Sequence, residues 1–311
     1  MLLSNLGAAG IPGGRLEWGE ALCVGPTPAG LDPDAWRATR AAFLEGTSPA
    51  ASVSASLAAA DRHLDRAARQ EDEIVLWYGP ELFCQAILIA ILDRLSNARA
   101  RLSLVSMDHY PGVVERGCTP SYLNTSQLQE VFRSRPRVTP EQLALGRLAW
   151  GAWCSPTPER LAALVASRPT SLPYLAEALR RELEELPAPG SGLSRTELTM
   201  LMALEAGRRR FGDLFRILQE QEERPWHTDT SLVGVLRQLA RGPVPLIQPL
   251  EPWGHTMMVQ STETGALVVA GSRDAVLLNG IDRWVGGTHL TPGTCWRWDA
   301  VVSRLIPPSA G

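Results

Sequence analysis

The chain has 311 residues, of which 45% are hydrophobic and 20% are charged, and its formal net charge is −3. This composition is typical of a globular protein and gives no whole-molecule field that would attract nucleic acid or an anionic membrane. Lysine is absent, since all 30 basic residues are arginine. That excludes a Schiff-base lysine, a pyridoxal-phosphate anchor and the lysine of a phosphate loop, and it suggests the coding bias of a GC-rich bacterial genome.

The chain shows no sign of export, membrane insertion or a cysteine-based metal site. Its five cysteines are widely spaced and none stands in a CxxC pair, so neither a zinc ribbon nor a thioredoxin-like motif is expected. Residues 1–14 lack the basic and continuous apolar segments of a signal peptide. No stretch approaches the roughly 18 apolar residues that a membrane span needs. We therefore expect a reduced, cytoplasmic protein.

The first predicted region, residues 1–125, begins with a short strand and two helices. Arg15–Trp18 is the candidate strand, and Gly25–Gly30 is rich in glycine and proline, as a turn is. Apolar spacing and helix propensity predict helices over Asp34–Glu45 and Ser52–Gln70.

A stronger pattern follows in the same region. Ile74–Tyr78 is a continuous apolar run, typical of a strand buried on both faces. Glu81–Leu95 carries apolar residues at helical spacing, and Leu102–Ser106 has the composition of a second strand. Strand, helix and strand at this spacing predict a right-handed βαβ unit. The region is therefore expected to be an α/β domain with a parallel, Rossmann-like sheet.

The second predicted region, residues 126–190, is a helical connector. Thr139 precedes Pro140 and Glu141 as an N-cap residue would. The expected helices are Ser126–Ser134, Pro140–Ala152, Pro158–Ser167 and Leu172–Leu186. Pro187–Gly192 is the clearest linker in the chain, and it separates the connector from the last region.

The third predicted region, residues 191–311, combines helices with strands. Ser194 and Glu197 have capping-box spacing at the start of a helix that is expected to end near Ala206. Two further helices are predicted over Phe211–Glu222 and Thr230–Arg241. Three strand-like segments come next, namely Thr256–Gln260, Ala266–Ala270 and Ala275–Leu278. Three helices followed by a β-hairpin predict a winged-helix-like α+β domain.

Two segments carry a resemblance to a known family. Glu73–Leu92 contains a strand that ends near a tryptophan and leads into an acidic residue and a glutamine on the next helix. Leu16–Gly30 ends in a Gly-Pro turn. The chain thereby resembles the bacterial domain-of-unknown-function family 1835, whose name implies no established activity. Further matching segments are Leu148–Trp153, Leu186–Arg195, Gly280–His289 and Trp296–Asp299.

The chain departs from that family at three places. The short opening strand with its His…Gly-Asp turn is missing. Glu20 stands where the family has an aspartate, and Glu81 is likewise longer by one methylene group. If the missing turn contributes to a site in the family, that site is altered or absent in this chain.

The predicted functional residues lie where the two strands of the βαβ unit end, because ligands of parallel sheets bind beyond the carboxyl ends of the strands. Glu81, Asp108 and His109 are the predicted catalytic residues, since a carboxylate beside a histidine can perform acid–base chemistry near neutral pH. The predicted ligand-binding residues are Glu20, Gly25, Trp77, Tyr78 and Gln85. The structural alternative is that Glu81 caps its helix and that Asp108-His109 is a polar turn.

Other motifs are weaker. Cys84 follows the same loop, but a cysteine beside Phe83 is more often packed than nucleophilic. No GxSxG elbow and no HExxH motif occurs, so no metal ligands are predicted. Gly7–Gly14 does not match a dinucleotide-binding loop, and His227-Thr228-Asp229 is more typical of a helix N-cap than of a metal site.

Charge and tryptophan patterns bear on the third region. From Ser191 onward there are twelve arginines and twelve acidic residues. DNA-binding domains usually carry a basic stripe, so nucleic-acid binding is not favoured. Trp284, Trp296 and Trp298 alternate with arginines; stacking on a base or aromatic ligand is possible chemistry, but packing on one face of a strand is the stronger interpretation.

Two functions follow as hypotheses. The first is an enzyme that acts on a small polar metabolite in the crevice at the ends of the α/β strands. The alternative is a DNA- or protein-binding regulatory module that uses the winged-helix-like region. A homo-oligomer and a small-molecule ligand are compatible with both hypotheses, a membrane partner is not expected, and the sequence identifies no cofactor.

Overall fold

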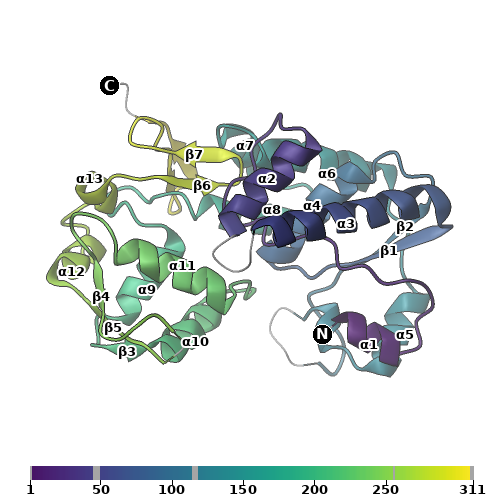
Figure 1. The fold of residues 1–311 in the computed structure, drawn as a ribbon, viewed down its shortest axis with the longest axis horizontal. Helices are drawn as coiled ribbons and strands as arrows, with labels where there is room; N and C mark the ends of the chain where they lie inside the picture. Colours follow the sequence, from purple (N-terminus) through teal and green to yellow (C-terminus); the bar gives the residue numbers. More distant parts are fainter. Residues whose placement is uncertain (1, 45–49, 114–117, 255, 309–311) are drawn as a thin grey trace.

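Figure 1 shows a computed structural model of the protein, which describes residues 2–44, 50–113, 118–254 and 256–308. The described chain is mixed α/β, with thirteen α-helices, one short 3-10 helix and nine strands. Its strands form four small sheets, of which one is parallel and three are antiparallel.

The parallel sheet is the predicted βαβ unit. Strand β1 (Glu73–Trp77) and strand β2 (Arg101–Val105) pair in parallel register, and helix α4 (Leu82–Arg94) connects them. Because α4 is apolar almost all round, nine of its residues are buried, as expected for a helix covered on every side. The prediction of a parallel α/β unit is confirmed, and its sheet has two strands within the described residues.

Helices enclose α4 and the sheet. Helix α6 (Pro140–Trp153) and helix α8 (Leu175–Leu183) both contact α4, and helix α7 (Glu159–Ser167) packs against α6 and α8. Gly146 permits the close approach of α6, because a Cβ atom there would overlap Leu92 of α4. Helix α2 (Pro33–Leu44) packs on helix α3 (Ala50–Gln70), as Figure 1 shows. The predicted helices of this part of the chain are confirmed; Glu45 lies outside the described residues.

The N-terminal segment differs from the prediction. Helix α1 (Leu2–Ala8) was not expected, and it packs with helix α5 (Thr125–Arg133) and the short 3-10 helix Pro120–Tyr122 in a small hydrophobic cluster. The predicted strand over Arg15–Trp18 is wrong, since these residues pair with no strand. Instead, the Trp18 indole donates a 3.0 Å hydrogen bond to Asp61, so a side-chain contact ties this segment to α3.

A second hydrophobic core is formed by consecutive elements. Its helices are α9 (Arg195–Ala203), α10 (Phe211–Gln221), α11 (Asp229–Leu239) and α12 (Glu263–Val269). Its strands are β3 (Arg209–Arg210), β4 (Ile247–Pro249) and β5 (Met258–Ser261), which pair antiparallel in the order β3-β5-β4. The three predicted helices and the first predicted strand are therefore confirmed, with small shifts of their ends.

Two other predicted strands are helices. Ala266–Ala270 lies in α12 and its C-cap, and Ala275–Leu278 lies in helix α13 (Ala275–Asn279). Both helices begin at a side-chain cap: Asp274 accepts hydrogen bonds from the Val276 and Leu277 amides at 2.9 and 3.1 Å, and Thr262 accepts one at 3.0 Å. These caps outweigh the strand preference of the β-branched residues that follow.

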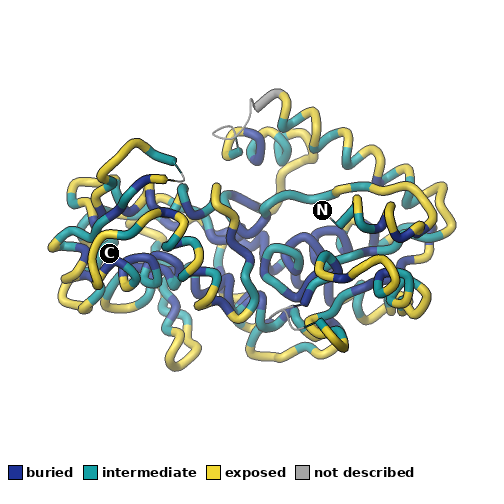
Figure 2. The backbone as a smooth tube through the Cα atoms, turned by 90° about the horizontal axis from the view of Figure 1, so that it is seen from below, coloured by how far each residue is buried: buried dark blue, intermediate teal, exposed yellow. Residues whose placement is uncertain are grey.

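The chain ends in two hairpins, β6–β7 (Arg283–Val285 and Thr288–Leu290) and β8–β9 (Arg297–Asp299 and Arg304–Ile306). Their buried residues Val285, Leu290 and Trp298 belong to the same core as Trp153 of α6. The C-terminal residues thus complete the core that the N-terminal elements begin, and Figure 2 shows buried backbone in both halves of the molecule. The three predicted domain ranges stay predictions.

Membrane insertion receives no support from the helices. In the part of the chain that the structure describes, none has both the length and the apolar character that a membrane crossing requires.

Candidate functional site

Glu81 lies at the turn between β1 and α4. The sheet extends into this turn, because the Tyr78 amide donates a 3.1 Å hydrogen bond to the Val105 carbonyl. Glu81 is the N-cap residue of α4, but its side chain makes no capping hydrogen bond. The carboxylate instead folds back over Gly79, where a Cβ atom would overlap it. A side chain at position 79 would therefore displace the Glu81 carboxylate from this place.

The Glu81 carboxyl group is placed where it favours its protonated form. Its Oε2 atom is buried and has no hydrogen-bond partner among the described residues. Burial raises the pKa of Glu81, and a hydrogen bond with Cys84 and the positive charge of Arg224 oppose that rise only in part. Burial and the nearby Glu81 also raise the pKa of the Cys84 thiol well above its usual value, so nucleophilic use of Cys84 is not favoured.

Three predicted ligand-binding residues hold the loop instead. The amide of Gln85, only 1% exposed, donates a 2.7 Å hydrogen bond to the Gly79 carbonyl. Trp77 stacks on Phe132 with ring centres 6.5 Å apart, and the Tyr78 hydroxyl donates to the Trp18 carbonyl at 3.5 Å. All three side chains fix the geometry of the turn that carries Glu81.

Glu20 and Gly25 belong to a neighbouring loop built around Arg40. The guanidinium of Arg40 is fully buried and binds both carboxylate oxygens of Glu20, at 2.7 and 3.2 Å. Its other hydrogen bonds reach the carbonyls of Ala21, Val24 and Pro26. Gly25 has a φ of 76° and faces the Phe43 ring, so a side chain there would be strained and would clash. The structure uses Glu20 to organise this loop.

Asp108 and His109 follow the second strand of the sheet, and they have different environments. Asp108 accepts a 3.3 Å hydrogen bond from the Tyr174 hydroxyl and forms an ion pair with Arg224 at 3.3 Å. His109 is exposed and forms no hydrogen bond with any residue that the structure describes. The structure therefore connects Asp108, but not His109, to the elements that surround Glu81.

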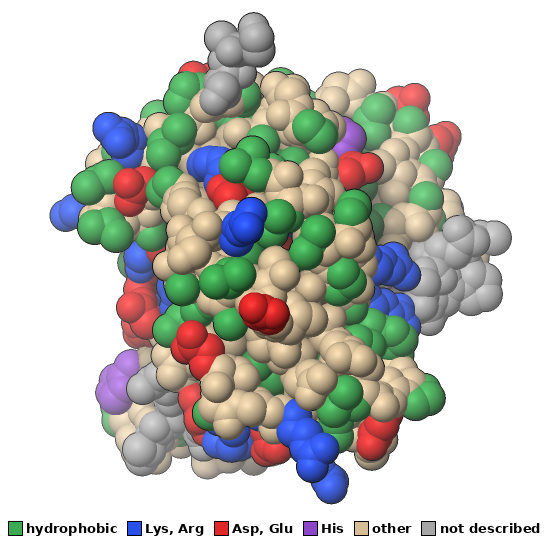
Figure 3. Space-filling model, turned by 90° about the vertical axis from the view of Figure 1, so that its left-hand side faces the viewer, with side chains coloured by type: hydrophobic (Ala, Val, Ile, Leu, Met, Phe, Trp, Pro, Cys, Tyr) green, Lys and Arg blue, Asp and Glu red, His purple; other side chains and the backbone are tan. Residues whose placement is uncertain are grey.

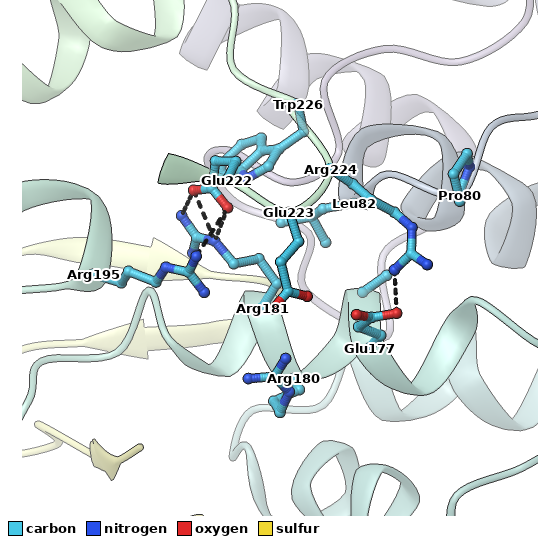
Figure 4. A pocket seen from close by; sticks show the side chains of 11 residues that line it. Pro80, Leu82, Glu177, Arg180, Arg181, Arg195, Glu222, Glu223, Arg224 and Trp226 are labelled. Carbon is cyan, nitrogen blue, oxygen red and sulfur yellow. Dashed lines mark hydrogen bonds and ion pairs between the residues drawn. The ribbon is translucent and has the colours of Figure 1, made fainter. Parts of the chain in front are cut away.

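A cleft opens beside this turn, and we call it the Arg224 cleft (Figure 4). Pro80 and Leu82 line it on either side of Glu81, and Trp226 adds an aromatic wall. The rest of the lining comes from α8 and from the segment after α10 and includes Glu177, Arg180, Arg181, Arg195, Glu222, Glu223 and Arg224. Its volume of about 30 Å³ is room for about two water molecules.

Arg224 closes this cleft with two ion pairs. One joins its guanidinium to Glu177 on α8, as the dashed line in Figure 4 shows, and the other joins it to Asp108 after β2. The guanidinium also lies 5.4 Å from the centre of the Tyr174 ring. An anion that bound Arg224 would therefore compete with Glu177 and Asp108 for its guanidinium.

Two carboxyl groups at the cleft have pKa values that move in opposite directions. The carboxyl of Glu223 faces that of Glu177, and this contact raises the pKa of Glu223. Burial alone would raise the pKa of Glu177 too, but hydrogen bonding and attraction by Arg224 outweigh it and lower that pKa. Two neighbouring carboxyl groups whose pKa values are pushed apart are the kind of pair that acid–base enzymes use.

The inner wall of the cleft is a buried ion-pair network. Arg181 binds Glu222 at 2.6 Å and Glu185 at 2.7 Å, and it donates a 2.9 Å hydrogen bond to Thr196. Burial alone would raise the pKa of Glu222, but contacts with His227 and Arg181 hold it at about 2. This network joins α8 to α9 and α10. It holds Glu222 in place, and Glu223 and Arg224 follow Glu222 directly in the chain.

Sequence analysis did not identify Glu177, Glu223 or Arg224. They carry no motif, and Arg224 is 47 residues from Glu177 and 116 from Asp108 along the chain. The one local feature near them is the run of charged residues around position 222. Such a run usually forms a solvated surface, so it did not indicate a site.

No metal site emerges from the described residues, where no three His, Cys, Asp or Glu side chains are grouped closely enough to hold an ion. His227 is buried against the Trp226 ring, with ring centres 3.6 Å apart, and its Nε2 lies 3.6 Å from Glu222. Its ring therefore belongs to the ion-pair network rather than to a ligand set with its sequence neighbours.

No protein-family model matches this chain, and no curated protein or solved structure resembles it at a significant level. The resemblance to family 1835 stays a prediction. The function must be argued from the residues of the site.

Proposed function

We propose that the protein is an enzyme that binds a small anionic metabolite in the Arg224 cleft and transfers a proton there. In this proposal the β1–α4–β2 unit is a minimal Rossmann-like element whose strand ends carry the site. Such a position is favoured for ligands because loops and helix N-termini converge there.

The observation that carries the proposal is the set of arginines at the carboxyl end of the sheet. Arg180, Arg195 and Arg224 line one small cleft, and each already binds a carboxylate: Glu184 for the first two and Glu177 for the third. A guanidinium that binds a protein carboxylate can bind a ligand carboxylate or phosphate with the same fork geometry. The anion would replace Glu177 or Asp108 on Arg224.

The proton would be carried by Glu223 or Glu81. Glu223 lines the cleft and its pKa is raised by Glu177. Glu81 stands between two lining residues, and its pKa is raised by burial. A carboxyl group with a raised pKa keeps its proton to higher pH than an ordinary one, so it is better suited to donate a proton and to accept one afterwards. Asp108 would position Arg224.

The proposal is tested by thermal unfolding in the presence of inorganic phosphate, pyrophosphate, succinate and citrate, with glycerol as a neutral control. An anion that binds only the folded state should raise the free energy of unfolding by about 2.7 kcal/mol when its concentration is about 100 times its dissociation constant. Arg224→Ala should abolish that stabilisation. Arg216→Ala is the matched control, because Arg216 is an exposed arginine on α10 that pairs with Glu220 outside the cleft.

Absence of stabilisation by any anion would overturn the proposal, as would equal stabilisation of the Arg224→Ala variant. Glu81→Gln and Glu223→Gln separate binding from proton transfer, because the amide keeps the shape of the side chain and removes the acid. Both variants should retain anion binding.

A second function is favoured by one observation, the order of elements in the second core. Helix α9, strand β3, helices α10 and α11, and strands β4 and β5 follow each other, and the sheet order is β3-β5-β4. This order supports a winged-helix-like arrangement in which α11 would be the recognition helix and the described residues 250–254 and 256–257 would belong to the wing. Such a module would bind DNA or a protein partner.

Charge weakens the DNA version of this second proposal. On α10, Arg216 is paired with Asp213 and Glu220, and basic and acidic side chains are interspersed on the molecular face in Figure 3. A basic stripe is what phosphate neutralisation requires. Fluorescence anisotropy with a labelled random duplex at low salt tests it, and we expect no saturable binding. Saturable binding that weakens as salt is added would instead support the module.

A further inference from the structure

A second, larger cavity lies between the second core and the C-terminal hairpins. Its volume is about 430 Å³, within the range of small-molecule sites. It is lined by the segment before α9, the end of α11, helix α13 and the start of β6, and no residue lines both this cavity and the Arg224 cleft. We call it the Arg241 cavity.

The lining of the Arg241 cavity mixes apolar with polar and charged side chains. Leu193, Leu239 and Leu246 lie behind it in the buried core of the α9–α12 unit, whereas Val276 and Ile281 on the opposite segment are only partly buried and present apolar surface to it. The side-chain amide of Asn279, which also lines it, is already occupied by two hydrogen bonds of 2.9 Å with the Val244 backbone. A ligand that fills this space would therefore bury an apolar body.

The acidic residues of the lining already have partners. Glu197 binds Arg283 at 2.9 Å and accepts a 2.8 Å hydrogen bond from the Ser194 amide. Asp282, which is largely exposed, lies 2.7 Å from His289. Arg283 thus neutralises the charge of Glu197, whereas the exposed Asp282 carboxylate at the rim keeps its negative charge, since a histidine offsets it only when protonated.

The basic residues of the lining are less fully used. Arg241, at the end of α11, is exposed and forms no ion pair with any residue that the structure describes. Arg283 is paired with Glu197, but its Nε atom is buried and has no hydrogen-bond partner among the described residues. Among the described residues, the cation of this lining without an ion pair is thus the Arg241 guanidinium, and a guanidinium binds carboxylates with two parallel hydrogen bonds.

We propose that the Arg241 cavity binds an amphipathic carboxylate, with the apolar body against Val276 and Ile281 and the carboxylate at Arg241. Of the two lining arginines, Arg283 is paired with Glu197 and Arg241 has no ion pair among the described residues. A singly charged carboxylate matches the one charge of Arg241, whereas a phosphate dianion would require further cations. This site is independent of the Arg224 cleft and does not rest on the proposed enzymatic function.

Isothermal titration of the full chain with octanoate tests the proposal, with octanol and acetate as matched probes that lack the charge or the apolar body. We expect saturable octanoate binding, binding of octanol at least about tenfold weaker, and no detectable binding of acetate. Arg241→Ala should weaken octanoate binding at least about tenfold. Arg273→Ala, which removes a nearby exposed arginine outside the lining, should leave it unchanged.

A second variant tests where the apolar part of the ligand binds. Val276→Trp fills the cavity and should abolish octanoate binding. If that variant fails to fold, titration of the Arg241→Ala variant still tests the proposal, because Arg241 is exposed and its substitution removes no buried contact. No binding of octanoate, equal binding by the Arg241→Ala variant, or octanol binding as tight as octanoate would each overturn the proposal.

Discussion

The two large hydrophobic cores differ in how far apart their members lie in the sequence. The first core combines residues from Leu22 to Trp298, whereas the second is formed by residues between Leu193 and Val268. A core of consecutive elements can be predicted from local patterns. The first core closes only when the C-terminal hairpins return to it, so its stability depends on contacts between distant segments.

Buried ion pairs join the two cores. Arg181 lies on α8, whose leucines belong to the first core, and it binds Glu222 at the end of α10; Arg283 binds Glu197 of α9. Because these charges are buried, each needs its partner, and removal of one partner affects both regions. Four substitutions test this comparison, and hydrogen exchange in α6 and α11 reports on the first and second core respectively.

Glu222→Ala should have the largest effect. It leaves Arg181 buried without its closest carboxylate, and loss of one partner of a buried pair costs about 3–5 kcal/mol. Chemical unfolding should show this loss, with faster exchange in both α6 and α11. Glu220→Ala, whose ion pair is exposed, should change stability by less than about 0.5 kcal/mol. Faster exchange in only one core would contradict the role of the network as a junction.

Gly287→Ala should act on the first core. A Cβ atom at this position would overlap the backbone of Cys154, while the Gly287 amide donates a 2.7 Å hydrogen bond to the Trp153 carbonyl. Overpacking of this kind costs about 2 kcal/mol. Exchange should accelerate in α6 more than in α11. Gly293→Ala is the matched control, because a Cβ atom there meets nothing within 4 Å, and an equal effect of both would refute this packing argument.

Glu73 should make the first core sensitive to acid. Hydrogen bonding to Arg135, helped by Ser103, holds the pKa of Glu73 at about 2, below its usual 4.5. This stabilisation is present above the usual pKa and is lost as pH falls towards 2; it amounts to about 1–2 kcal/mol. The Glu73→Gln variant should therefore lose less stability than the unaltered protein between roughly pH 5 and pH 2. Parallel pH profiles of the two proteins would exclude this contribution.

Ser194→Ala should have the smallest effect, and it should act on the second core. The Ser194 hydroxyl accepts a 3.2 Å hydrogen bond from the Glu197 amide, and Glu197 binds the Ser194 amide in return. Loss of an N-cap costs about 1 kcal/mol. Thermal unfolding should show the loss, and Ser194→Thr should restore most of it. A variant with unchanged stability would mean that packing alone holds the start of α9.

Several elements could be predicted because their signal is local. The apolar run Ile74–Tyr78, the helix after it and the second strand specify the βαβ unit without distant contacts. The capping box at Ser194 likewise marks the start of α9. The strands expected at Ala266–Ala270 and Ala275–Leu278 failed for a local reason as well, since the caps at Thr262 and Asp274 start helices.

The sequence by itself therefore determined most helices, the parallel pair of strands and the position of Glu81 at the end of β1. It did not determine that Gln85 and Glu20 would hold loops, since one side chain can serve a ligand or a backbone carbonyl equally well. Only the tertiary structure brought Arg224 to Asp108 and Glu177. The reason is physical: periodicity and capping act over a few residues, whereas this site exists only after both cores have packed and their buried charges have found partners.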